Sequence, residues 1–67
     1  MIITDEQKQT IKKIMPDIDD WLKKGYRDFI DEFYELILTT FKNDEPIDIS
    51  YELERVYDEI VYQNKKK

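Results

Sequence analysis

The sequence contains no cysteine and no histidine, and it has a single serine and a single glycine. Without cysteine there is neither a disulfide nor a thiolate ligand to reinforce a small domain. Without histidine and cysteine, the chain also lacks the commonest general base and the best nucleophile at neutral pH. One glycine cannot form a phosphate-binding loop, and Ser50 has no candidate base near it in the sequence. We therefore expect a protein that is not an enzyme and that has neither catalytic residues nor a cofactor.

A metal site would have to consist of oxygen ligands only. The segment that begins at Asn43 comes nearest, since Asn43, Glu45 and Glu54 match positions one, three and twelve of an EF-hand loop. The match fails at Ile47, where a ligand is needed, and at Asp48, where the sharp turn requires glycine. We therefore expect no metal site.

The sequence also lacks a long apolar run. No segment approaches the roughly 18 apolar residues that span a bilayer, and no basic segment followed by an apolar one opens the chain. We expect a cytoplasmic protein that does not bind membranes. Its 67 residues form a single helical domain over 1–67, and a domain of this size buries only about 60% of the surface of its unfolded chain.

Helical spacing of apolar residues predicts an all-α fold, a small three-helix bundle. Thr4 and Gln7 have the spacing of a capping box, so the first helix should begin there and end or kink at Pro16. After a loop at residues 43–50, the last helix should cover about 49–63, with Asp48 or Ser50 as its N-cap.

The central helix begins near residue 17, and its apolar stripe continues to residue 41. Gly25 either ends a short helix at 17–24 or bends one long helix. We favour a long helix kinked near Gly25, because the stripe keeps its helical phase across the glycine; if the helix is interrupted, the bundle has four helices. We expect the following side chains to be buried: Trp21, Phe29, Phe33, Leu36, Ile37, Phe41, Leu53, Val56 and Ile60.

Positive charge is scarce in the second half of the chain. Residues 28–64 hold eleven acids and only two cations, Lys42 and Arg55, a net charge of −9; residues 1–27 carry +1 and the three terminal lysines +3, which gives the overall −5. Binding to nucleic acid requires clustered lysine and arginine, so a chain with a pI near 4.6 should not bind nucleic acid directly. The asymmetry favours a protein partner with a basic surface.

Four of these acids, Asp28, Asp31, Glu32 and Glu35, are spaced i, i+3, i+4, i+7 and should lie on one face of the central helix. A solvated helix face usually mixes the two signs of charge, whereas here each like-charge pair costs about 0.2–0.5 kcal/mol. The two interpretations are a solvated face, with Lys24 and Arg27 offsetting part of the repulsion from the preceding turn, and a protein-binding face.

A second candidate lies on the last helix. Tyr51 and Tyr62 should lie on the side away from the core, with Arg55 and Asp58 between them. Tyrosine and arginine often contribute most of the binding energy at the centre of protein interfaces. The alternatives are packing against the N-terminal segment and plain surface exposure.

The acidic stripe from Asp28 to Glu35 is about 10 Å long and carries four charges, where duplex DNA would carry about six. The leading hypothesis is a regulator or inhibitor that occupies a basic surface of a partner, such as a nucleic-acid-binding one. Its action would be locally DNA-mimic-like, of the anti-restriction, anti-CRISPR or antirepressor type. The alternative is a structural or self-associating protein whose apolar stripes are completed in a homodimer.

Overall fold

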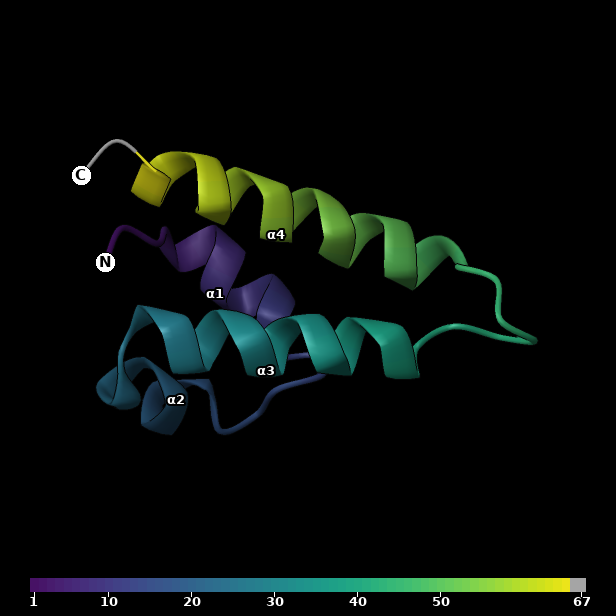
Figure 1. The fold of residues 1–67 in the computed structure, drawn as a ribbon, viewed down its shortest axis with the longest axis horizontal. Helices are drawn as coiled ribbons and strands as arrows, with labels where there is room; N and C mark the ends of the chain where they lie inside the picture. The colour runs from purple at the N-terminus through teal and green to yellow at the C-terminus, as the bar shows by residue number, and fades with distance from the viewer. Residues whose placement is uncertain (66–67) are drawn as a thin grey trace.

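The computed structural model describes residues 1–65 and confirms the all-α prediction. Its helices are α1 (Asp5–Ile11), α2 (Ile18–Lys24), α3 (Tyr26–Thr39) and α4 (Asp48–Lys65). Helices α3 and α4 run antiparallel, while α1 packs against α4 and α2 against α3 (Figure 1). Within residues 1–65, no helix is both long enough and apolar enough to cross a membrane.

The predicted capping box opens α1. The Thr4 hydroxyl accepts a hydrogen bond from the Gln7 backbone N–H at 3.1 Å, and Gln7 Oε1 accepts one from the Thr4 N–H at 3.0 Å. Gln7 is buried, and its Nε2 donates to Gln63 Oε1 at 2.7 Å and to Glu59 Oε1 at 3.1 Å. The same side chain therefore caps α1 and joins it to α4, which satisfies the polar atoms of a buried amide.

The prediction of one long central helix is wrong: the chain breaks into α2 and α3 at Gly25. Gly25 has φ +111° and ψ 167°, far from helical values and in a region that is essentially restricted to glycine. Its N–H donates to Leu22 O at the end of α2, and its carbonyl accepts from Phe29 N–H at the start of α3. One residue thus ends one helix and begins the next, and α2 folds back along α3 (Figure 1).

A tight turn joins α3 to α4. Lys42 and Glu45 exchange two backbone hydrogen bonds of 2.8 Å, and both residues between them have positive φ, 52° at Asn43 and 64° at Asp44. Positive φ at both central positions is the geometry of a type I′ turn, which asparagine and aspartate tolerate better than most residues. The predicted loop is therefore an ordered reversal that makes α3 and α4 antiparallel neighbours.

Ser50 is not an N-cap, because α4 already begins at Asp48 and Ser50 is completely buried in its first turn. Its hydroxyl accepts from the Ile47 N–H at 3.1 Å and lies 2.6 Å from the Thr40 hydroxyl. Because Thr40 donates its only hydroxyl hydrogen to Ile37 O, Ser50 must be the donor to Thr40. The serine thus connects the end of α3 to the start of α4.

Replacing Ser50 with alanine should lower the free energy of unfolding by about 1 kcal/mol, because two hydrogen bonds are lost while water can still reach the exposed Ile47. Thr39→Ala is the matched control, since the exposed Thr39 hydroxyl bonds only to Leu36 O. Urea unfolding of both variants measures the difference. Equal losses for the two would contradict a linking role for Ser50.

The core is built from the inner faces of all four helices. Six of the nine side chains expected to be buried are buried, but Trp21, Leu36 and Phe41 are only half-buried at its edge. Trp21 lies on the outer side of the short α2, where its Nε1 donates to Asp17 Oδ2 at 3.1 Å and Lys24 Nζ lies 4.1 Å from its ring centre. The core also contains four residues that we did not select: Ile11, Met15, Ile18 and Ile30.

Candidate functional site

The acids of the candidate binding face lie on the outside of α3. Asp28, Asp31 and Glu35 are exposed and Glu32 is half-buried. None of the four has a lysine or arginine nitrogen within 4 Å in residues 1–65; the ion pairs found there are Lys8–Asp19 at 2.7 Å and Lys13–Glu52 at 3.2 Å. Within the part of the chain that the structure describes, the acids of α3 thus form no ion pair with lysine or arginine.

Two of these four acids border aromatic side chains. Asp31 and Glu35 line a shallow depression of about 440 Å³ between α3 and α4, together with Tyr34 and Tyr57. Asp28 and Glu32 are not part of its lining, and by helical phase they point to the flank away from Tyr34. Within the predicted stripe, one pair of acids therefore borders aromatic side chains and the other pair does not.

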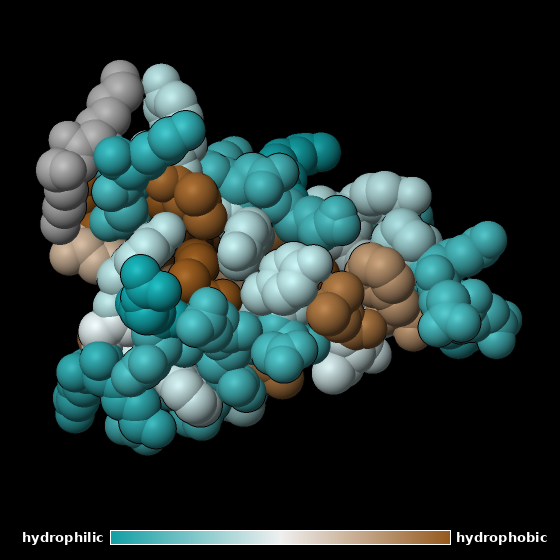
Figure 2. Space-filling model, in the orientation of Figure 1, coloured by the Kyte–Doolittle hydropathy of each residue, from teal (hydrophilic) through white to brown (hydrophobic). Residues whose placement is uncertain are grey.

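The depression belongs to a longer surface with the same chemistry on both helices. Each helix presents an acid, a tyrosine, a second acid and an aliphatic residue at i, i+3, i+4 and i+7. We call this surface the α3–α4 seam, and it consists of Asp31, Tyr34, Glu35 and Leu38 on α3 and of Glu54, Tyr57, Asp58 and Val61 on α4. In Figure 2, brown and pale side chains form a band where α3 and α4 meet, with teal side chains on either side.

Tyr34 and Tyr57 form the centre of the seam, with ring centroids 5.6 Å apart. Tyr34 is 49% exposed and Leu38 42%, whereas Tyr57 and Val61 are half-buried. Tyr57 also packs on Phe33, so the seam is continuous with the core. Sequence reasoning missed this site, because it did not consider Tyr34 or Tyr57 as part of a binding surface. The repeated acid–tyrosine–acid–aliphatic spacing is the signal that could have revealed it.

The surroundings of Tyr57 raise its pKa above the ordinary value. Partial burial is the main cause, followed by the nearby Tyr26, Tyr34, Asp31 and Asp58. The two carboxylates come from different helices, so both α3 and α4 direct negative charge toward this hydroxyl. Because the proton is held more tightly in the folded state, this contribution to stability is complete below pH of about 10 and is lost as the pH rises further.

Replacing Asp31 and Asp58 with asparagine should lower the pKa of Tyr57 but leave it above the ordinary value, because burial remains. NMR titration of ¹³C-labelled tyrosine rings measures this midpoint. The matched control is Asp28→Asn with Glu32→Gln on the other flank, which should leave the midpoint unchanged. An equal fall in both variants would mean that the effect is overall charge and not the local field of the seam.

The four residues of the second predicted cluster are all exposed on α4. Tyr51 and Tyr62 are exposed, at 60% and 63%, as expected. Between them, Arg55 lines a hollow between α1 and α4, whereas Asp58 acts on Tyr57 at the seam. Asp58 therefore also acts on the seam together with Asp31 of α3, while the four residues as one binding patch stay a prediction.

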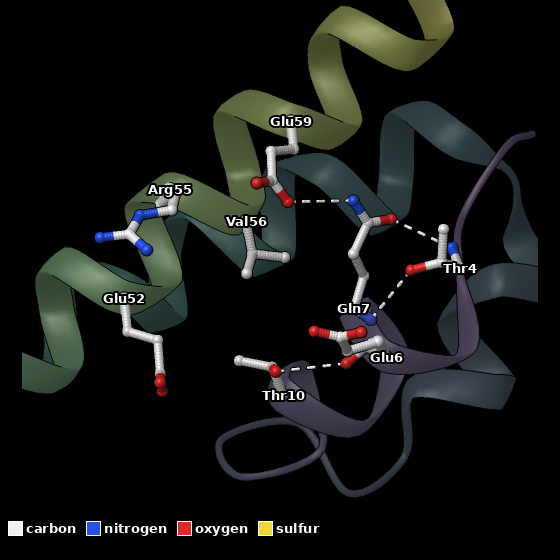
Figure 3. A pocket seen from close by; sticks show the side chains of 8 residues that line it. All are labelled: Thr4, Glu6, Gln7, Thr10, Glu52, Arg55, Val56 and Glu59. Atoms are coloured by element: carbon white, nitrogen blue, oxygen red, sulfur yellow. Dashed lines mark hydrogen bonds between the residues drawn. The ribbon is translucent and has the colours of Figure 1, made fainter.

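The hollow between α1 and α4 is mainly polar (Figure 3). Glu6 and Thr10 reach it from α1, and Glu52, Arg55 and Glu59 from α4, while Gln7 spans it to bond Glu59. Despite its acids, no group of three potential metal ligands converges here or elsewhere in residues 1–65. The bond from Gln7 to Glu59 gives this hollow a structural role between α1 and α4.

Comparison of the chain with protein-family models, curated proteins and solved structures returns no match.

Proposed function

We propose that this protein is a cytoplasmic, non-enzymatic module that binds another protein through its acidic side and occupies a basic surface of that partner. The partner class includes nucleic-acid-binding proteins, for which the α3 acids would act as a local substitute for phosphates. Complementary charge would speed the encounter, and desolvated tyrosines would slow dissociation.

One observation carries this proposal: the four acids of α3 have no cation within 4 Å in residues 1–65, although they repel one another. Asp28 and Glu32, and Asp31 and Glu35, are like-charge pairs at i, i+4 that each destabilise the helix by about 0.2–0.5 kcal/mol. A small domain has little stability to spare. A partner that supplies lysine and arginine would turn this repulsion into attraction.

Capture from a lysate of the source cells at low ionic strength tests the proposal. We expect the immobilised protein to retain a protein with a basic surface and to release it as salt is raised. Neutralising Asp28, Asp31, Glu32 and Glu35 to asparagine and glutamine should weaken this capture and leave the fold slightly more stable.

The matched control neutralises four acids outside α3: Glu6→Gln, Asp20→Asn, Asp44→Asn and Glu45→Gln. This control changes the net charge by the same amount as the α3 variant and should still capture the partner. Equal loss of capture in both variants would contradict the proposal, because it would reduce the effect to overall charge.

Self-association is the second candidate. The observation that favours it is the exposure of Tyr34 and Leu38 beside each other on α3, since a symmetric dimer would cover both. Such a dimer would be held by apolar contact and should therefore persist at high salt. The mass of the purified protein in solution at low and high salt distinguishes it from a monomeric module.

A further inference from the structure

The α3–α4 seam combines two features that separately would carry little meaning. Tyr34 and Leu38 expose apolar surface, and the ring of Tyr34 packs against that of Tyr57 in a tilted arrangement across the boundary between the helices. Four carboxylates border this strip: Asp31 and Glu35 from α3 and Glu54 and Asp58 from α4. Apolar surface with a negatively charged rim is complementary to an apolar ridge with a positively charged rim.

The charge of the seam disfavours a second copy of this chain as its occupant. A symmetric contact through the seam would bring four carboxylates of each copy to one interface. The cations nearest in helical phase are Arg27, one turn before Asp31, and Lys65, one turn after Val61. Both cations lie beyond the same end of the seam, because Tyr26 and Asn64, their neighbours in sequence, line one hollow where α3 starts and α4 ends.

We propose that the α3–α4 seam is the docking site for a basic amphipathic helix of the partner, a step that rests on the proposed function. From Asp31 to Leu38 the seam extends over about 10 Å along α3, which corresponds to about two turns of a bound helix. Such a helix places apolar residues at i, i+3, i+4 and i+7 over Tyr34, Tyr57 and Leu38. Lysine or arginine on both sides of its apolar ridge meets the carboxylates of α3 and α4.

A synthetic peptide tests this assignment without knowledge of the natural partner. The probe is a capped helical peptide of about four turns with leucine at i, i+3, i+4 and i+7 and lysine elsewhere. A second peptide has the same composition with the leucines scattered around the helix. Calorimetry at low ionic strength measures affinity, and shifts of ¹⁵N-labelled amides locate the contact. We expect the first peptide to bind about tenfold more tightly than the second and to shift the amides of the seam.

Matched variants separate the seam from overall charge. Asp31→Asn, Glu35→Gln and Asp58→Asn together should weaken binding of the first peptide about tenfold. The control, Asp20→Asn, Asp28→Asn and Glu32→Gln, removes the same charge outside the seam and should change the affinity less than about twofold. Tyr34→Ala should also weaken binding about tenfold, whereas Tyr34→Phe, which keeps the ring contact with Tyr57, should bind as tightly as the parent. Thermal unfolding checks that each variant is folded.

Each of the following results would overturn the seam assignment. Equal affinity for the two peptides, or an equal loss of affinity in both charge variants, would mean that the peptide binds by non-specific electrostatic attraction. A loss confined to the control variant would move the contact to the other flank of α3 and leave the proposed function intact. A dimer of the free protein that Tyr34→Ala dissociates would identify a second copy as the occupant. If neither peptide binds and the lysate yields no basic partner, the proposed function fails together with the seam.

Discussion

The Phe33→Ala variant should be largely unfolded at room temperature and should therefore show no cooperative thermal unfolding. Phe33 is completely buried, and its ring lies 5.7 Å from that of Phe29 and 5.9 Å from that of Tyr57, measured between centroids. Truncating such a residue costs about 3–5 kcal/mol. A domain of this size is expected near the lower end of the range of about 5–15 kcal/mol for native proteins, so little or no stability would remain.

Thermal unfolding followed by circular dichroism measures this effect. Leu38→Ala is the matched control, because Leu38 lies on the same helix but is substantially exposed, and it should cost less than about 1 kcal/mol. A Phe33→Ala protein that unfolds cooperatively within a few degrees of the parent would contradict the position of Phe33 at the centre of the core.

Gly25→Ala should lower the free energy of unfolding by about 1–3 kcal/mol, because alanine is strained at φ +111° and ψ 167°. No atom beyond the neighbouring residues lies within 4 Å of the added Cβ, so the cost comes from the backbone alone. The sign of the effect is diagnostic. Within a continuous helix, the same substitution would raise stability by about 1 kcal/mol.

Urea unfolding of Gly25→Ala measures that sign, with Lys23→Ala as the control. Lys23 is exposed in the last turn of α2, and its replacement by alanine should be almost neutral. Stabilisation by Gly25→Ala would mean that α2 and α3 form one helix after all.

Local signals in the sequence were sufficient for several parts of the fold. The Thr4–Gln7 pair identified the start of α1, because a capping box involves only residues three positions apart. Helical spacing identified Phe29, Phe33 and Ile37 as core residues of α3. Gly25 was misread because apolar spacing records which residues face the core and not the direction of the helix axis. Two short helices that both pack on one core preserve the same spacing.

Most of the candidate site could be recognised only from the three-dimensional structure. Exposure of Asp28, Asp31 and Glu35 follows from helical phase alone and is confirmed. The pairing of Tyr34 with Tyr57 does not, since they are far apart in the chain and meet only because the turn at Asn43 and Asp44 makes α3 and α4 antiparallel. The same arrangement lets Asp31 of α3 and Asp58 of α4 both act on Tyr57.

The most direct measurement of the central claim is the association rate of the captured partner with the parent protein and with the variant neutralised at Asp28, Asp31, Glu32 and Glu35, over a series of salt concentrations. We expect the parent to associate rapidly at low salt, with a rate that falls steeply as salt is added. The variant should associate more slowly and with a flatter dependence on salt, while its dissociation rate changes little. A folded variant with unchanged affinity and an unchanged salt slope would contradict the claim that the acidic side binds the partner.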